Sequence, residues 1–261
     1  MTDLKAINEK LNQYIRPQTF PLAVKMCERP EDLPEGTKFP KRDLGISVAL
    51  CQALNMARRY GWTMGVSRED QACPHGQVVL GFVPSEGYLD GTLAEEAGLA
   101  KKEVFALNAR KLSLLPYGKY SHLVAAPIDH AAFQPDLIML YGNPAQIVRL
   151  VQGYAAAVGG SLRCDTEGGR GCSIYIARTL LTEDCQIVLP GAGDRYFGLT
   201  QDHEMAFTMP MRLAEKTVQG LEMTHKIGLR YPTPSWLRFE GALPDQYYAF
   251  TELLAKQKPK P

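Results

Sequence analysis

The chain has 261 residues, of which 45% are hydrophobic and 22% are charged, and its formal net charge is +1. This length and composition suit one or two globular domains with a sizeable core. A net charge near zero provides no basic surface of the kind that binds nucleic acid. No apolar run approaches the roughly 20 residues of a membrane span, so we expect neither a nucleic-acid nor a membrane partner.

The N-terminal segment, residues 1–19, predicts an amphipathic helix. Leu4, Ile7 and Leu11 follow helical spacing, and Pro17 stops the helix. The segment lacks the apolar core of a signal peptide, so we expect a cytoplasmic protein. Six cysteines in a cytoplasmic chain indicate buried thiols, metal or cluster ligands, or catalytic residues rather than a disulfide framework.

Residues 20–128 form the first half of the predicted core, in which strands and helices alternate. Gly61 is expected to cap the first long helix, and Thr92 a later one, with Glu95 three residues on. In chain order we predict a strand at 21–26, a proline-rich loop at 28–42, a long helix at 45–60, strands at 62–66 and 77–82, helices at 92–99 and 103–115, and a strand at 122–128.

Residues 129–224 form the second half, and residues 225–261 form a C-terminal extension. Asn143 and Pro144 are expected to start the second long helix. In chain order we predict a strand at 137–141, a helix at 145–158, a strand at 161–164, a glycine loop at 167–172, a strand at 186–189, a glycine loop at 190–195, a strand at 204–209, and helices at 210–223 and 245–254. This alternation predicts an α/β fold, with strands and helices in mixed α+β layers.

A weak internal repeat relates the two halves. Leu50-Cys51-Gln52 and Leu150-Val151-Gln152 occupy corresponding places in two Ala-rich helical runs that end in glycine. A strand, a charged loop and a cysteine follow each run, namely Cys73 in the first copy and Cys172 in the second. The repeat predicts two pseudo-symmetric halves, each with strands and a long helix, packed around a shared central site.

If the two cysteine loops face each other, Cys51, Cys73 and Cys172 converge. Soft thiolates from scattered positions are typical ligands of iron–sulfur clusters. Candidates for a fourth ligand or a supporting contact are His75, Cys27 and Asp70, with Cys164 and Cys185 as further thiols. The alternative is that the cysteines are ordinary core residues, because free cysteine is among the most buried residue types and the chain has no CxxC motif.

Two other chemistries remain open. Backbone N–H groups of the loop Gly169-Arg170-Gly171 could bind a small anion, with charge from Arg170 and Arg195. Neither glycine loop matches the phosphate-loop or dinucleotide patterns, and plain turns are the alternative. A protonated His75 would instead lower the pKa of the Cys73 thiol and make it a nucleophile, as in thiol enzymes.

The motifs that carry these residues also occur together in one known family. They lie at 20–25, 50–53, 57–58, 69–70, 73–76, 135–136, 169–172, 190–195 and 202–204. Together they resemble the uncharacterised family called domain of unknown function 169, or ArCR, over about residues 20–221. This family of anaerobic bacteria and archaea has no established activity, so the resemblance implies no reaction. It implies that Cys51, Cys73 and Cys172 are the family's motif cysteines, whereas the other three cysteines match no motif.

The sequence therefore favours a cytoplasmic iron–sulfur protein of anaerobic metabolism. A 4Fe–4S cluster held by Cys51, Cys73 and Cys172 would have a redox or Lewis-acid role. The alternatives are a cluster-free module that binds a small anionic molecule, and a thiol enzyme that uses Cys73 with His75. A redox partner protein and a homo-oligomer are further expectations, and no catalytic residue or substrate is assigned.

Overall fold

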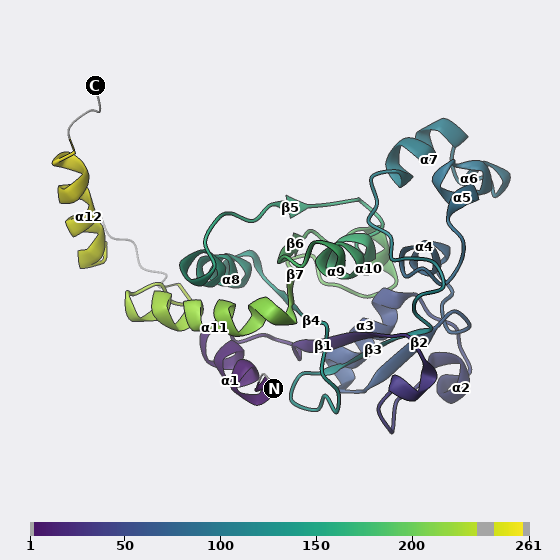
Figure 1. Cartoon of the computed structure of the whole chain (residues 1–261), viewed down its shortest axis with the longest axis horizontal. Coiled ribbons are helices and arrows are strands. Elements are labelled where there is room, and N and C mark those ends of the chain that lie inside the picture. The colour runs from purple at the N-terminus through teal and green to yellow at the C-terminus, as the bar shows by residue number, and fades with distance from the viewer. Residues whose placement is uncertain (1–2, 234–242, 258–261) are drawn as a thin grey trace.

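The structure, a computed structural model, describes residues 3–233 and 243–257 (Figure 1). Seven strands form one sheet, in the order β2-β3-β1-β4-β7-β6-β5. Neighbouring strands are antiparallel except for β5 and β6, which are parallel. The strands are β1 (Leu22–Cys27), β2 (Met64–Ser67), β3 (His122–Pro127), β4 (Leu137–Gly142), β5 (Cys164–Asp165), β6 (Gln186–Val188) and β7 (Met205–Pro210).

Helices occupy most of the remaining described chain, and two of the segments are not α-helical. These two are a 3₁₀ turn, η1 (Pro30–Asp32), and a π-helix, η2 (Ser173–Arg178). The α-helices are α1 (Leu4–Tyr14), α2 (Pro40–Leu44), α3 (Leu50–Tyr60), α4 (Pro74–Val79), α5 (Glu86–Leu89), α6 (Thr92–Glu96), α7 (Lys102–Ala109), α8 (Pro144–Ala157), α9 (Thr179–Thr182), α10 (Ala192–Tyr196), α11 (Met211–Lys226) and α12 (Asp245–Ala255). Within the described residues, no helix has the length and apolar character needed to cross a bilayer.

The sheet separates two apolar cores, because successive side chains of a strand point to opposite faces. Leu137 and Met139 of β4 pack into a core with α3, α4 and η2. Ile138 and Leu140 pack on the other face, in a core with α1, α8 and α11. A smaller cluster joins α4, α5, α6 and α7, of which α5 to α7 gather beyond the sheet in Figure 1.

The mixed α/β class is confirmed, but the predicted pseudo-symmetry of two halves is not. The first long helix, α3, and the second, α8, cover opposite faces of the sheet. A two-fold axis through the central antiparallel pair of β1 and β4 would place them on the same face. The pairing of β1 with β4 also carries the sheet across the predicted boundary between residues 128 and 129.

The strand predicted at 77–82 is wrong, because residues 74–79 form α4. Pro74 at its first position is preorganised for a helix, and Val79 and Leu80 pack into the core beneath α3. The apolar run that resembled a strand is therefore a short helix stabilised by tertiary packing.

One predicted helix start and one predicted N-cap are also wrong. The first long helix begins at Leu50 and not at residue 45, because Gly45 adopts φ 70° and ends α2. Thr92 does not cap α6, whose N-cap is Gly91 with φ 84°.

Several predicted caps and helices are confirmed. Gly61, with φ 75°, ends α3, and Asn143 accepts a hydrogen bond from the Gln146 backbone N–H at the start of α8. The last predicted helix is α12, none of whose described side chains is buried. Parts of the predicted C-terminal extension, 234–242 and 258–261, lie outside the described residues.

Candidate functional site

Cys51, Cys73 and Cys172 line one small cavity on the α3 face of the sheet, which we call the cysteine cavity. Its volume is about 30 Å³, which leaves room for little more than one water-sized group. The other lining residues that matter below are His75, Gly169, Gly171, Tyr175, Gly193 and Asp194. Three thiols from three separate segments therefore meet at one place.

Each group at the cavity lies at the start of a helical segment. Cys51 is the second residue of α3, Cys73 and Cys172 directly precede α4 and η2, and Asp194 is the third residue of α10. The first N–H groups of a helix have no partner within the helix, so they favour negative charge nearby. Backbone hydrogen bonds from Gln52 to Cys51, and from Ser173 to Cys172, lower the pKa values of these thiols in this way.

Burial nevertheless dominates the protonation of the thiols. It raises the pKa of Cys51 to about 12, with further increases from the charges of Asp194 and Cys73. It raises the pKa of the buried Cys172 thiol well above its ordinary value, and Asp194 and Cys73 again add to the rise. The Cys51 thiol accordingly donates a hydrogen bond to the Gly193 carbonyl, with Sγ and O 3.3 Å apart. Without a cation, both thiols hold their protons at neutral pH.

Asp194 and Tyr175 also line the cavity, although neither was expected there from the sequence. The Tyr175 hydroxyl donates to Asp194 Oδ1 at 3.1 Å, and Asp194 is only 2% exposed. Burial raises the pKa of Asp194, against the hydrogen bond from Tyr175. The available signal was the motif at 190–195, in which the glycines were considered and the aspartate was not.

His75 lines the cavity but is not an imidazolium. Its Nδ1 lies 2.8 Å from the Tyr88 hydroxyl, and its ring faces that of Phe105. Burial lowers the pKa of His75, and the positive charge of Arg170 lowers it further. The imidazole is therefore neutral at pH 7, which weakens the hypothesis of a thiol enzyme activated by an ion pair between Cys73 and His75.

The remaining cysteines lie elsewhere. Cys27 ends β1, where its Sγ lies 3.8 Å from the Asp32 carbonyl, and burial raises its pKa to about 11. Cys164 is exposed on β5, and Cys185 is buried in the core on the opposite face of the sheet. None of these three lines the cysteine cavity.

Only some of the predicted anion-binding residues lie at the cysteine cavity. Gly169 and Gly171 line the cavity, and the Arg170 guanidinium lies over the Phe105 ring, 5.3 Å from its centroid. Arg195 does not line the cavity, and its Nη1 donates to the Gln201 carbonyl at 2.8 Å.

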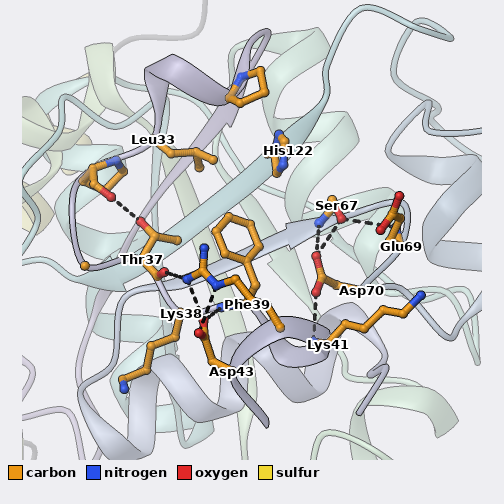
Figure 2. Close-up of a pocket in the computed structure, with 14 residues that line it drawn as sticks. Leu33, Thr37, Lys38, Phe39, Lys41, Asp43, Ser67, Glu69, Asp70 and His122 are labelled. Carbon is orange, nitrogen blue, oxygen red and sulfur yellow. Dashed lines mark hydrogen bonds and ion pairs between the residues drawn. The ribbon is translucent and has the colours of Figure 1, made fainter. Parts of the chain in front are cut away.

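Asp70 lies in a different and much larger pocket, of about 1050 Å³, between the loop around η1, α2 and the end of β2 (Figure 2). Its carboxylate accepts hydrogen bonds from the Ser67 N–H, the Ser67 hydroxyl and the Lys41 N–H, at 3.0, 2.6 and 3.0 Å. Figure 2 shows these bonds joining β2 to α2. Asp70 therefore fixes the wall of this pocket rather than supporting the cysteines.

The donor types at the cysteine cavity fit a soft metal centre, since three thiols line it. In the described part of the chain, no three His, Cys, Asp or Glu side chains are already arranged to hold a metal ion. A cluster would also need more room than the cavity has. Its binding therefore requires the sulfur atoms to rotate and the walls to move apart.

Comparisons with known proteins support a family but no activity. The family described as uncharacterised ArCR, domain of unknown function 169, matches residues 10–220. An uncharacterised protein of Methanocaldococcus jannaschii is 24% identical over 204 residues, which cover 77% of this chain and 86% of that protein. No solved structure matches the chain.

Proposed function

Because the chain belongs to the uncharacterised ArCR family, we propose its function from the cysteine cavity: the protein binds an iron–sulfur cluster there. Cys51, Cys73 and Cys172 are the cluster ligands in this proposal. The observation that carries it is that these three thiols, from segments far apart in sequence, line one cavity. Thiolates are the usual protein ligands of such clusters.

The charges around the cavity support an occupant that supplies metal cations to the thiols and whose negative charge is stabilised by backbone N–H groups. Buried thiols with raised pKa values keep their protons at neutral pH, and binding of iron would displace these protons to solvent and leave the sulfur atoms as thiolate ligands. The backbone N–H groups of Gln52 and Ser173 already point at the sulfur atoms of Cys51 and Cys172, and they would stabilise the negative charge of a thiolate-bound cluster. These contacts would also tune its reduction potential.

Three cysteines are one fewer than the usual set for a 4Fe–4S cluster. The cluster would supply electron transfer or a Lewis-acidic iron in anaerobic metabolism. The role of the chain is to bind it, to orient it on a rigid sheet and to limit access of water. Glycine residues at 169, 171 and 193 form part of the cavity wall. Because they have no side chains, they allow backbone close to the sulfur atoms.

Anaerobic purification tests the proposal. We expect a coloured protein with iron and acid-labile sulfide near four of each per chain, and broad absorption in the visible. Replacing Cys51, Cys73 or Cys172 with serine should strongly reduce both contents. The matched control is Cys164→Ser, at an exposed cysteine outside the cavity, which should retain both.

Two results would contradict the cluster. One is a wild-type protein free of iron and sulfide after anaerobic purification and reconstitution. The other is stoichiometric zinc without sulfide, which would assign the cavity to a single metal ion. The serine variants are checked by circular dichroism, so that loss of metal is not confused with loss of the fold.

A second candidate function is binding of a small organic anion beside Arg170. The observation that favours it is that Arg170 Nη1 is buried and has no acceptor among the described residues. An unpaired buried donor is costly, and an anionic group would satisfy it. Organic anions should then raise the melting temperature of the metal-free protein, and Arg170→Ala should abolish the rise. The same rise in the variant would exclude this site.

A further inference from the structure

We propose that Asp194 is the fourth protein ligand of the cluster, which makes the site a Cys₃Asp centre. This inference rests on the proposed function, because it assigns the iron that the three cysteines leave without a protein ligand. Asp194 lines the cysteine cavity together with all three cysteines. It contributes a carboxylate, a hard ligand that distinguishes one iron from the other three.

The position of Asp194 is fixed by its neighbours on both sides. The preceding residue, Gly193, accepts the hydrogen bond from Cys51 Sγ. Asp194 Oδ2 packs against Gly171, the residue before Cys172, so closely that a Cβ added to Gly171 would lie 2.7 Å from this oxygen. The carboxylate therefore lies between the segments that carry Cys51 and Cys172.

The two carboxylate oxygens have different surroundings. Oδ1 accepts the hydrogen bond from Tyr175, whose side chain is 2% exposed and belongs to the π-helix η2. Metal-binding carboxylates are commonly held by such a second hydrogen bond, which sets their orientation. This bond fixes the carboxylate at the cavity while Oδ2 remains on the Gly171 side. A π-helix is rare and frequently marks a functional site.

His75 is the competing protein ligand at the cavity. Its Nδ1 is bonded to Tyr88, so only Nε2 remains for a metal. Its ring, however, packs with Tyr88 and Phe105 in the separate apolar cluster of α4 to α7. Asp194 lies instead on the segment that contacts Cys51 directly. Cys27, Cys164 and Cys185 lie outside the cavity and do not compete.

The test compares iron content in anaerobically reconstituted wild type and three full-length variants. Wild type should hold about four irons per chain. Asp194→Asn should hold about three, and its electron paramagnetic resonance spectrum should be that of a three-iron cluster. Asp194→Cys restores a thiolate and should hold four. His75→Ala, the matched control, should also hold four.

The outcomes separate this inference from the proposed function. A wild-type protein without iron and sulfide contradicts both. A wild-type four-iron cluster that persists with four irons in Asp194→Asn overturns the Asp194 assignment alone, as does loss of one iron in His75→Ala but not in Asp194→Asn. Far-ultraviolet circular dichroism establishes that each variant is folded. Asp194→Cys is a second test of the same position, because it is expected to retain all four irons.

Discussion

Two buried aspartates, Asp70 and Asp194, show how differently one residue type is used in this molecule. They are 3% and 2% exposed, so both lose nearly all contact with water. Asp70 accepts three hydrogen bonds from Ser67 and Lys41 at the wall of the large pocket (Figure 2). Asp194 accepts a hydrogen bond from the Tyr175 hydroxyl and faces the cysteine cavity, where burial raises its pKa against the hydrogen bonds from Tyr175 and from the backbone N–H groups of Gly191 and Asp194.

The difference separates a structural carboxylate from a functional one. A buried charge with several N–H and O–H donors is stabilised and holds segments together. A buried carboxylate among thiols is destabilising until a cation arrives, and such perturbed groups gather at functional sites. The small cavity is therefore a stronger candidate site than the large pocket, although volume alone would favour the pocket.

The largest effect that this comparison predicts is at Asp70. In Asp70→Ala, the backbone N–H groups of Ser67 and Lys41 lose their acceptor, and the side-chain link between α2 and β2 is lost. We expect the free energy of unfolding in urea to fall by about 3 kcal/mol. The neighbouring Glu69→Ala, at an exposed residue, should change it by less than about 0.5 kcal/mol. If the two substitutions lower the free energy of unfolding equally, the structural role assigned to Asp70 is wrong.

A second prediction examines the packing around Asp194. In Gly171→Ala, the new methyl group would lie 2.7 Å from Asp194 Oδ2 and 2.9 Å from Tyr175 Cε1. Overpacking of this kind should lower the free energy of unfolding by about 2 kcal/mol. Gly169→Ala is the matched control, because nothing lies within 4 Å of its added Cβ. Urea titrations of the metal-free proteins measure the free energy of unfolding of both variants. If Gly171→Ala leaves this free energy unchanged, the Asp194 carboxylate is free to move aside.

Local sequence signals predicted much of the fold. Gly61 correctly predicted the end of α3, and Asn143 the start of α8, because capping chemistry acts within a few residues. Residues 77–82 were predicted as a strand because a run rich in valine does not reveal that Pro74 starts a helix there. The face of the sheet that each helix covers depends on tertiary packing, so the internal repeat could not determine it.

The meeting of three cysteines was expected from a symmetry that is not confirmed. Its physical cause is that α3, α4 and η2 pack on the same face of the sheet, which brings their N-terminal ends together. Their role as ligands remains a prediction. Asp194 was missed because an aspartate in a glycine-rich turn is usually a turn residue, and only its burial distinguishes it.

The smallest predicted effect is that of Asp194→Asn on stability, and it has the opposite sign to the effect of substituting Asp70. An acid whose pKa is raised on folding keeps its proton while the unfolded chain, with an ordinary pKa of 3.8, loses it. The wild type therefore loses stability as the pH rises from 3.8 through the raised pKa of the folded state, and the loss persists at neutral pH. Asp194→Asn carries no such charge and should make the metal-free protein more stable at pH 7.

Urea unfolding of metal-free wild type and Asp194→Asn across this pH range provides the measurement. The advantage of the variant should shrink towards zero as the pH falls well below 3.8, where Asp194 is protonated in both the folded and the unfolded wild type. Asp70→Asn, measured beside it, should be destabilising at pH 7, because the amide cannot accept all three hydrogen bonds. If Asp194→Asn is instead destabilising at pH 7, then Asp194 is an ordinary structural aspartate. A variant that is more stable without metal, yet holds one iron fewer, would show that the chain keeps an unfavourable buried charge at this position because the cluster needs it.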